Sequence, residues 1–480
     1  MKTVSSTTLG LAAALALAFA LLWPSGEARA QTPSTAVKLA PINPIAHRTR
    51  PHLDHSAYFK EDIKEPQAVT AKCLTCHKDA AKEVMKTPHW TWLSGDVERG
   101  GKTVRTGKSN LMNNFCISVS GNWASCTKCH AGYGWTDANF DFKKEQNVDC
   151  LVCHDGSGSY TKDKGGLPGK KVNLAAVARS VRAPYRENCG ICHFNGGGGR
   201  GVKHGDLDDS LLNASEEVDV HMGKLNFQCI DCHQTHNHVV PGKVNATYTN
   251  KTPAKRFDCV DCHKTTPHAD GQLNQHVARV ACQTCHIPAF ARKYPTKMDW
   301  DWSKAGDATR KDNAHEYLKI KGEFKYDEDV RPEYAWYNGR MDRYIMGDKL
   351  TSTDQAMNQP LGNRKDLTAK IWPFKVHRAK QIFDPINKIL IPPITSGEGG
   401  FWTKFDWAFA AKKGAEVAGL PYSGQYDFTQ THMFWPITHM TAPKKEALTC
   451  LNCHGKEGRL DWKALGYDHD PVGGKNSHAK

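Results

Sequence analysis

The chain is poor in apolar residues, and after residue 30 it has no long apolar run. Hydrophobic residues make up 39% of its 480 residues, which is low for a chain expected to bury a large core, while glycine (40) and proline (24) are frequent. No later stretch approaches the ~18 uninterrupted apolar residues of a membrane span. The formal net charge is +14, but the basic residues are spread out rather than gathered in a stripe, which argues against nucleic-acid binding. The composition leaves open what fills the core.

A repeated pattern of cysteine and histidine answers this question. Cys-x-x-Cys-His occurs eight times, as Cys73, Cys76 and His77; Cys126, Cys129 and His130; Cys150, Cys153 and His154; Cys189, Cys192 and His193; Cys229, Cys232 and His233; Cys259, Cys262 and His263; Cys282, Cys285 and His286; and Cys450, Cys453 and His454. The pentapeptide is the attachment signal of haem c, whose iron takes the histidine as one axial ligand. A zinc half-site or a redox dithiol explains one Cys-x-x-Cys pair, but not eight that are each followed by histidine. We therefore predict eight covalently bound haem c groups.

Seven motifs fall within residues 71–290, at intervals too short to build separate apolar cores. We expect the haems themselves to form the core of this seven-haem segment. The predicted fold class is mainly α with much irregular structure, a multihaem cytochrome c fold organised around stacked haems.

Residues 291–445 carry no motif but many aromatic side chains, and we interpret them as a cap on the haem core. Small β-hairpins are expected in this cap, one at Asn338-Gly339 and one around Asp384-Pro385. Residues 406–418 predict a helix that ends near Gly419. Residues 446–480 hold the eighth motif and a tail.

The first 30 residues have the features of a signal peptide: Lys2, an apolar run from Leu9 to Leu22, and a small-x-small site at Ala28-Arg29-Ala30. We expect cleavage near Ala30 and export to the periplasm, a compartment that suits haem attachment. The polar, proline-rich residues 31–70 are expected to form an arm laid over the haem core.

Histidine is abundant enough to supply second axial ligands. The eight motifs use eight of 24 histidines. The best candidates among the others lie near a motif or in a short aromatic or turn context: His55, His89, His221, His268, His276 and His439, together with His236 or its neighbour His238, of which we select His236. If every iron has two histidines, the protein is an electron conduit; if one iron has a weak or absent second ligand, it is an enzyme. The count alone leaves both possibilities open.

Sixteen of 17 cysteines belong to the motifs, and Cys116 remains. With the eight motifs, three further segments carry a resemblance: Asn-Asn-Phe-Cys (113–116), Gly-Gly-Gly-Gly-Arg-Gly-Val-Lys-His-Gly-Asp-Leu-Asp (196–208) and Trp-Pro-Ile-Thr-His-Met (435–440). Nearly the whole chain after the signal peptide resembles the octahaem tetrathionate reductase family. The resemblance implies that the second haem is the active one, with His130 as proximal ligand, Lys203 as distal ligand and Cys116 beside it. It also implies reduction of tetrathionate and, in the same pocket, of nitrite or hydroxylamine. Where the family loop can carry an acid, this chain has Arg200.

The basic cluster of Lys375, His377 and Arg378 suits an anion route, so we place His377 at the pocket or its rim, with distal ligation as the alternative. The expected partners are a small anionic substrate and a periplasmic or membrane-bound electron donor, with no nucleic acid; the oligomeric state is left open. A conduit without a substrate site remains an alternative. A hydroxylamine oxidoreductase is disfavoured because only a short tail with one tyrosine, Tyr467, follows His454. A pentahaem-type nitrite reductase is disfavoured because no Cys-x-x-Cys-Lys occurs.

Overall fold

The longest strand of the protein, β10 (Lys370–Asp384), organises the C-terminal part of the chain. In the computed structural model, the described residues are 52–93, 95–99, 101–115, 118–196, 198–242 and 258–472. Strand β10 pairs antiparallel with β12 (Asp427–Pro436) and parallel with β3 (Thr296–Asp301). It is rich in aromatic and β-branched residues, and side chains on both of its faces are buried. It therefore lies inside the structure rather than at a solvent-exposed face.

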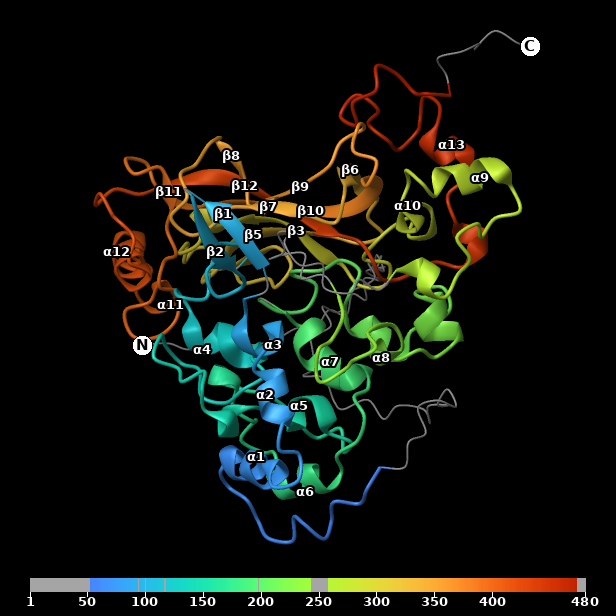
Figure 1. Cartoon of the computed structure of the whole chain (residues 1–480). Helices are drawn as coiled ribbons and strands as arrows, with labels where there is room; N and C mark the ends of the chain where they lie inside the picture. Colours follow the sequence, from blue (N-terminus) through green and yellow to red (C-terminus); the bar gives the residue numbers. More distant parts are fainter. Residues whose placement is uncertain are drawn as a thin grey trace, which may run out of the picture. The chain divides into compact units, whose positions relative to one another are not determined.

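The sheet around β10 has eight strands in the order β4-β5-β3-β10-β12-β8, with β11 and β6 also paired to β10. Figure 1 shows these strands gathered together, with β12 beside β10. The remaining strands are β1 (Gly95–Arg99), β2 (Lys102–Thr106), β4 (Tyr317–Leu318), β5 (Gly322–Asp327), β6 (Glu333–Tyr337), β7 (Met341–Arg343), β8 (Asp354–Ala356), β9 (Asn358–Pro360) and β11 (Ile389–Leu390).

Seven of the α-helices in the described residues carry residues of the Cys-x-x-Cys-His motifs, and five of these seven are only four or five residues long. A helical turn puts the two cysteines, three residues apart, on one face, where both can reach one porphyrin. Motif residues lie on α1 (Pro66–Leu74), α4 (Trp123–Cys126), α5 (Leu151–His154), α7 (Arg186–His193), α8 (Cys229–Cys232), α10 (Cys282–His286) and α13 (Cys450–Cys453). The other helices are α2 (Ala80–Val84), α3 (Pro88–Thr91), α6 (Leu174–Arg179), α9 (Gly271–His276), α11 (Phe401–Lys404) and α12 (Trp407–Ala418).

The predicted fold class is confirmed: short helices and irregular segments are joined to a β-rich C-terminal part. Helix α12 is capped by Asp406 and ends at Gly419, as predicted, because Gly419 takes the left-handed conformation (φ 66°) that favours glycine. The hairpin at Asp384-Pro385 is also present, as the β10–β11 pair.

The hairpin predicted at Asn338-Gly339 is wrong. Strand β6 before this turn pairs with β10, and β7 after it pairs with β9. A type I′ turn needs positive φ at both central residues, but only Gly339 of the pair has it (86°). The Asn338 N–H instead donates to the carbonyl of Leu361, and its amide donates to Asp366. The two strands therefore diverge into different pairings.

Apolar packing is concentrated in the cap. Its largest cluster joins Trp300 and Trp435 of the sheet, and Trp302 of the turn that follows β3, to Phe401 and Trp407 of the helices α11 and α12. A smaller cluster near the start of the described chain packs Phe59 and Val69 against residues of α5 and α6. In the part of the chain that the structure describes, no helix has the length and apolar character needed to cross a membrane.

Candidate functional site

Seven of the eight motif histidines face a second histidine. The ring centres are 6.4 Å apart for His77 and His55, 6.3 Å for His154 and His238, 6.2 Å for His193 and His89, 6.5 Å for His233 and His439, 6.1 Å for His263 and His221, 6.1 Å for His286 and His268, and 6.3 Å for His454 and His276. The partners come from many elements: His221 lies on the π-helical turn Val220–Lys224, and His439 follows β12.

These spacings are those of two imidazoles bound to one metal from opposite sides. A metal–imidazole bond is about 2.0–2.1 Å long and a ring centre lies about 1.1 Å behind its nitrogen, so the two ring centres should be about 6.3 Å apart. Stacked histidines in van der Waals contact would be closer. The seven pairs therefore fit haem iron, and each pair contains one motif histidine.

Six residues selected from the sequence stand in these pairs: His55, His89, His221, His268, His276 and His439. The seventh needs correction, because His238 rather than His236 lies opposite His154. Residues 236–239 form a tight turn in which Asn237 and His238 both have positive φ (47° and 59°). This turn leaves the His236 side chain exposed and directs His238 inward, where its Nδ1 meets Glu83 at 2.7 Å.

The remaining motif histidine, His130 of the second motif, has different neighbours. Its ring is fully buried among aromatic side chains, with ring centres 5.0 Å from Trp90, 5.7 Å from Trp92 and 4.8 Å from Trp135. No other histidine ring of the described residues packs against it. Its Nε2 lies 2.8 Å from the carbonyl oxygen of Trp90. Burial lowers the pKa of His130 to about 3, so the imidazole is neutral and its Nε2–H donates to the Trp90 carbonyl.

Lys203 acts electrostatically on Cys129, which belongs to the same motif as His130. Lys203 is half-buried, and its Nζ is 4.9 Å from the ring centre of Trp435. Burial, and then the positive charge of Lys108, lower the pKa of Lys203 to about 8, while the thiol of Cys129 acts in the opposite direction. A thioether carries no charge, so this opposing effect is lost once haem is attached at Cys129. The amine is thereby brought towards its neutral form, which can bind iron.

The loop before Lys203 is held against the cap. The carbonyl of Gly201 accepts hydrogen bonds from the Lys297 N–H and the Thr296 hydroxyl, both at 2.8 Å. Gly201 has φ of +64°, and a Cβ at this position would meet the carbonyl oxygen of Pro295 at 2.6 Å. Only glycine permits this approach. Lys203 therefore projects from a backbone fixed by β3.

Strand β10 adds two fully buried polar side chains to the site. The Lys375 amine donates to the Thr296 hydroxyl at 2.6 Å and to the Val202 carbonyl at 3.2 Å. The Nδ1 of His377 lies 3.0 Å from the amide oxygen of Asn114, and its Nε2 is buried without a hydrogen-bond partner among the described residues. Burial lowers the pKa of both groups, that of Lys375 to about 7.

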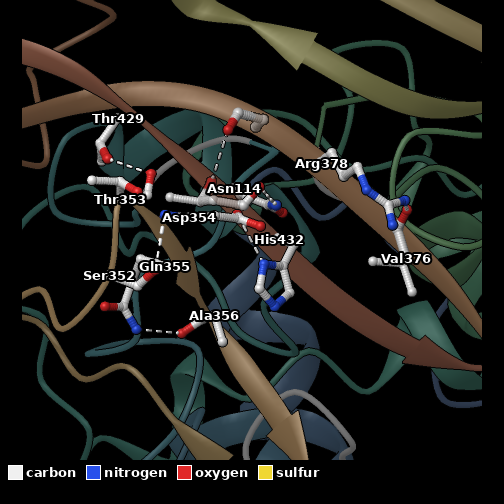
Figure 2. A network of polar contacts seen from close by, with 12 residues as sticks. Asn114, Ser352, Thr353, Asp354, Gln355, Ala356, Val376, Arg378, Thr429 and His432 are labelled. Atoms are coloured by element: carbon white, nitrogen blue, oxygen red, sulfur yellow. Dashed lines mark hydrogen bonds and ion pairs between the residues drawn. The ribbon is translucent and has the colours of Figure 1, made fainter. Parts of the chain in front are cut away.

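Asn114 links the segment leading to Cys116 to two strands of the cap. Its amide donates to the carbonyl of His377 on β10 at 2.7 Å and to that of Thr431 on β12 at 3.4 Å. Figure 2 shows Asn114 beneath these strands, with the His432–Asp354 ion pair (2.9 Å) nearby where β12 meets β8. Phe115 packs on Trp435, with ring centres 5.7 Å apart. The segment before Cys116 and the loop of Lys203 therefore both contact the cap at Trp435.

Comparisons with known proteins agree with this geometry. Family models described as "Cytochrome c554 and c-prime", "Cytochrome c7 and related cytochrome c" and "Cytochrome c bacterial" match residues 72–155, 214–287 and 297–457. A crystal structure of octahaem cytochrome c from Shewanella oneidensis matches with a TM-score of 0.82 and 46% identity, covering 89% of this chain and 99% of that one. The chain belongs to the octahaem c-type cytochrome family. An uncharacterized protein from Archaeoglobus fulgidus is 26% identical over 237 residues, covering 39% of this chain and 80% of that protein.

Two other residues that the sequence analysis of this octahaem cytochrome named are Cys116 and Arg200. Cys116 lies outside the described residues, as do residues 1–30. Arg200 pairs with Asp209 at 2.6 Å and its guanidinium lies 3.6 Å from the Tyr294 ring centre, so its charge is balanced by an acid.

Sequence reasoning missed Lys108 and Asp206 in this octahaem cytochrome. The Lys108 amine stands 3.9 Å from the ring centre of Trp92, which itself packs on His130. Asp206 is 2% exposed and contacts His439. A lysine in a polar stretch resembles a solvated side chain, so nothing in the sequence marked Lys108. Asp206 stood three residues after Lys203 in the loop that carries the resemblance, which is the signal that could have found it.

Proposed function

We propose that this octahaem cytochrome is an exported reductase for a small sulfur or nitrogen oxyanion, tetrathionate and also nitrite or hydroxylamine, with its substrate site at the haem held by Cys126, Cys129 and His130. One observation carries the proposal. Seven motif histidines face a histidine, whereas His130 faces none among the described residues, and the amine of Lys203 lies close enough to Cys129 of the same motif to act on its thiol.

In this proposal eight haems are bound, and seven have two histidine ligands. The pairs are those given above, with His238 in place of His236. Lys203 is the second ligand at the His130 site. Imidazole binds ferrous haem more strongly than an amine does, so Lys203 would be the weakest protein ligand of the set. The haems supply the electrons of the reaction. The protein residues bind and orient the substrate and deliver protons.

The charges around the site suit an anion. In its protonated form, Lys203 would be a hydrogen-bond donor with positive charge beside the substrate. Lys108 adds a second positive charge near Cys129 and Lys203. Aromatic side chains around His130 exclude water and so strengthen both interactions.

His377 and Cys116 complete the proposed pocket. The His377 Nδ1–H donates to the Asn114 oxygen, because the amide nitrogen of Asn114 is engaged with a carbonyl. The Nε2 lone pair is then free to take a proton and pass it on. Cys116 follows Asn114 by two residues in the sequence, and we assign it a place beside the substrate. The proposed electron donor is a periplasmic or membrane-bound protein.

Substitution of the distal lysine tests the proposal. In Lys203→Ala we expect seven low-spin haems with two histidine ligands to persist and one haem to become high-spin and open to added ligands, as measured by EPR and by titration with carbon monoxide. Turnover of tetrathionate and nitrite should fall by about 10²-fold, since a positive donor to the substrate is lost.

Lys224→Ala is the matched control, because Lys224 forms an exposed ion pair with Glu216 (2.8 Å) and should leave spectra and turnover unchanged. Intact mass should show eight haems in both variants. If Lys203→Ala has no new high-spin haem and keeps full activity on both substrates, the reductase assignment fails and the protein is an electron conduit.

A further inference from the structure

Three of the paired histidines have a carboxylate on Nδ1, which leaves Nε2 for iron. The Nδ1 of His238 lies 2.7 Å from an oxygen of Glu83, and that of His454 lies 2.7 Å from Asp470. The Nδ1 of His439 lies 3.3 Å from Asp206 and 3.1 Å from the Thr438 hydroxyl. They belong to the haem sites of the third, eighth and fifth motifs.

Other ligands of the same set use uncharged acceptors. The Nδ1 of His55 lies 2.7 Å from the carbonyl of Leu53. The histidines that face His238 and His439 also bond to backbone carbonyls. The Nδ1 of His154 lies 2.9 Å from the carbonyl oxygen of Arg182, and the Nδ1 of His233 lies 2.7 Å from that of Pro241. At the haem sites of the third and fifth motifs, therefore, the Nδ1 of one histidine bonds to a backbone carbonyl and the Nδ1 of the other lies near a carboxylate.

The three carboxylates are held in place by the fold. Asp206 is 2% exposed and accepts the N–H groups of Thr438 and His439 at 2.7 and 3.0 Å. Asp470 accepts the N–H groups of Gly455 and Val472 at 2.7 and 3.0 Å. Glu83 lies on α2, and an oxygen of its carboxylate lies within hydrogen-bond distance of the Nδ1 of the half-buried His238. Groups fixed in this way keep their charge close to the ligand.

We propose that Glu83, Asp206 and Asp470 are positioning residues that lower the reduction potentials of the haems bound at the third, fifth and eighth motifs. A carboxylate that accepts the Nδ1 proton makes the imidazole a more electron-rich ligand and adds negative charge nearby, and both effects favour oxidised iron. The inference rests on the ligand pairs of the proposed function. It divides the haems with two histidine ligands into three of low potential, which release electrons most readily, and four others that accept them.

The test replaces each acid with its amide, as Glu83→Gln, Asp206→Asn and Asp470→Asn, in the holoprotein. The amide is a neutral acceptor like a backbone carbonyl. In each variant we expect the midpoint potential of one haem to rise while the other seven keep theirs, as measured by potentiometric titration followed optically and by EPR. The EPR signal of that haem should stay low-spin, because the ligand is still present.

Asp219→Asn is the matched control. An Asp219 oxygen lies 4.0 Å from the Nδ1 of His221, too far for a hydrogen bond, and the carboxylate instead caps the N–H groups of His221 and Met222 at 2.8 Å. Asparagine keeps such a cap. The variant loses a nearby charge without losing an Nδ1 hydrogen bond, so its shift should be smaller than the other three.

Two results would overturn the proposal: titration curves of Glu83→Gln and Asp470→Asn that superimpose on the wild-type curve, or an equal shift in Asp219→Asn. Asp206 also accepts backbone N–H groups, so its replacement can disturb the fold. The potential measured for Asp206→Asn is therefore used only if intact mass shows that the variant carries eight haems. His238→Ala separates this failure from a failure of the ligand assignment. A lost low-spin signal in His238→Ala with unchanged potentials in the amide variants rejects the tuning alone, whereas eight unchanged signals in His238→Ala reject the ligand pair.

Discussion

The amine of Lys375 donates a hydrogen bond to the carbonyl of Val202, the residue just before Lys203, across 173 positions of sequence. The central strand of the cap is thus tied directly to the loop that carries the proposed distal ligand. The cap segment therefore fixes the backbone from which Lys203 projects. Four predictions follow from this site and its surroundings.

Lys375 should make stability depend on pH. Burial lowers its pKa from 10.5 to about 7 in the folded protein. Between those two pH values Lys375 is protonated in the unfolded chain but not in the folded chain, so the free energy of unfolding rises with pH. The cost of holding a charged Lys375 in the interior is greatest at and below pH 7. From pH 7 to 9.5 the wild type should gain about 3 kcal/mol that Lys375→Met does not gain. Denaturant unfolding at both values measures this gain.

The control for this measurement is Lys412→Met, at an exposed position of α12. It should keep the pH dependence of the wild type. An equal gain in Lys375→Met and the wild type would show that Lys375 is charged in the folded protein.

His377→Phe should separate the two substrates. Reduction of tetrathionate to thiosulfate consumes two electrons and no protons, whereas reduction of nitrite to ammonium consumes six electrons and eight protons. If the Nε2 of His377 passes protons, nitrite turnover should fall by about 10²-fold while tetrathionate turnover changes little. Loss of a low-spin signal would instead identify His377 as a ligand, and no change in either activity would identify a structural histidine.

The buried pair of Lys162 and Asp149 should be needed for stability. Both side chains are fully buried, 2.6 Å apart, and the hydroxyls of Tyr133 and Tyr160 donate to the same carboxylate at 3.0 and 2.8 Å. Lys162→Met leaves a buried carboxylate without its cation and should cost about 3–5 kcal/mol in denaturant unfolding. The double variant with Asp149→Asn should recover part of this loss. A single variant as stable as the wild type would contradict the prediction.

His238 and His236 offer a matched pair of substitutions two positions apart. His238→Ala should convert one low-spin haem to high-spin, because His238 faces His154 with ring centres 6.3 Å apart. His236→Ala removes an exposed side chain and should leave the EPR spectrum unchanged. The reverse result would restore the ligand selected from the sequence.

The haem-attachment sites could be predicted from the sequence because each one is a run of five contiguous residues. The short helical turns around the motifs follow from Cys-x-x-Cys-His, the family follows from the motifs together with three further segments, and six of the selected histidines stand opposite motif histidines. Which motif histidine each of them faces could not be predicted from the sequence. His439 faces His233, and His89 faces His193, although the members of each pair are far apart in the chain. His236 was selected over His238 because the sequence does not show which way a turn with two positive φ angles directs its side chains.

The sheet was the least predictable part of the fold. Strand β10 is buried on both faces, so it lacks the alternation of apolar and polar residues that marks a half-exposed strand. Its pairing with β3 is parallel and joins segments about 80 residues apart, which no local signal encodes. The basic residues of β10 suggested the pocket or rim of an anion route, and the sequence did not show that Lys375 and His377 are completely buried.

Strand β10 also makes the site vulnerable to a change in chain length. Lys375, His377 and Gln381 sit at odd positions of one strand, and they reach Val202, Asn114 and the carbonyl of Asn113 on the same side of the sheet. Because side chains alternate along a strand, deleting one residue between Lys370 and Phe374 would turn all three to the opposite side at once. Related chains should therefore vary the residues of this strand while keeping its length, with insertions and deletions confined to the loops at its two ends.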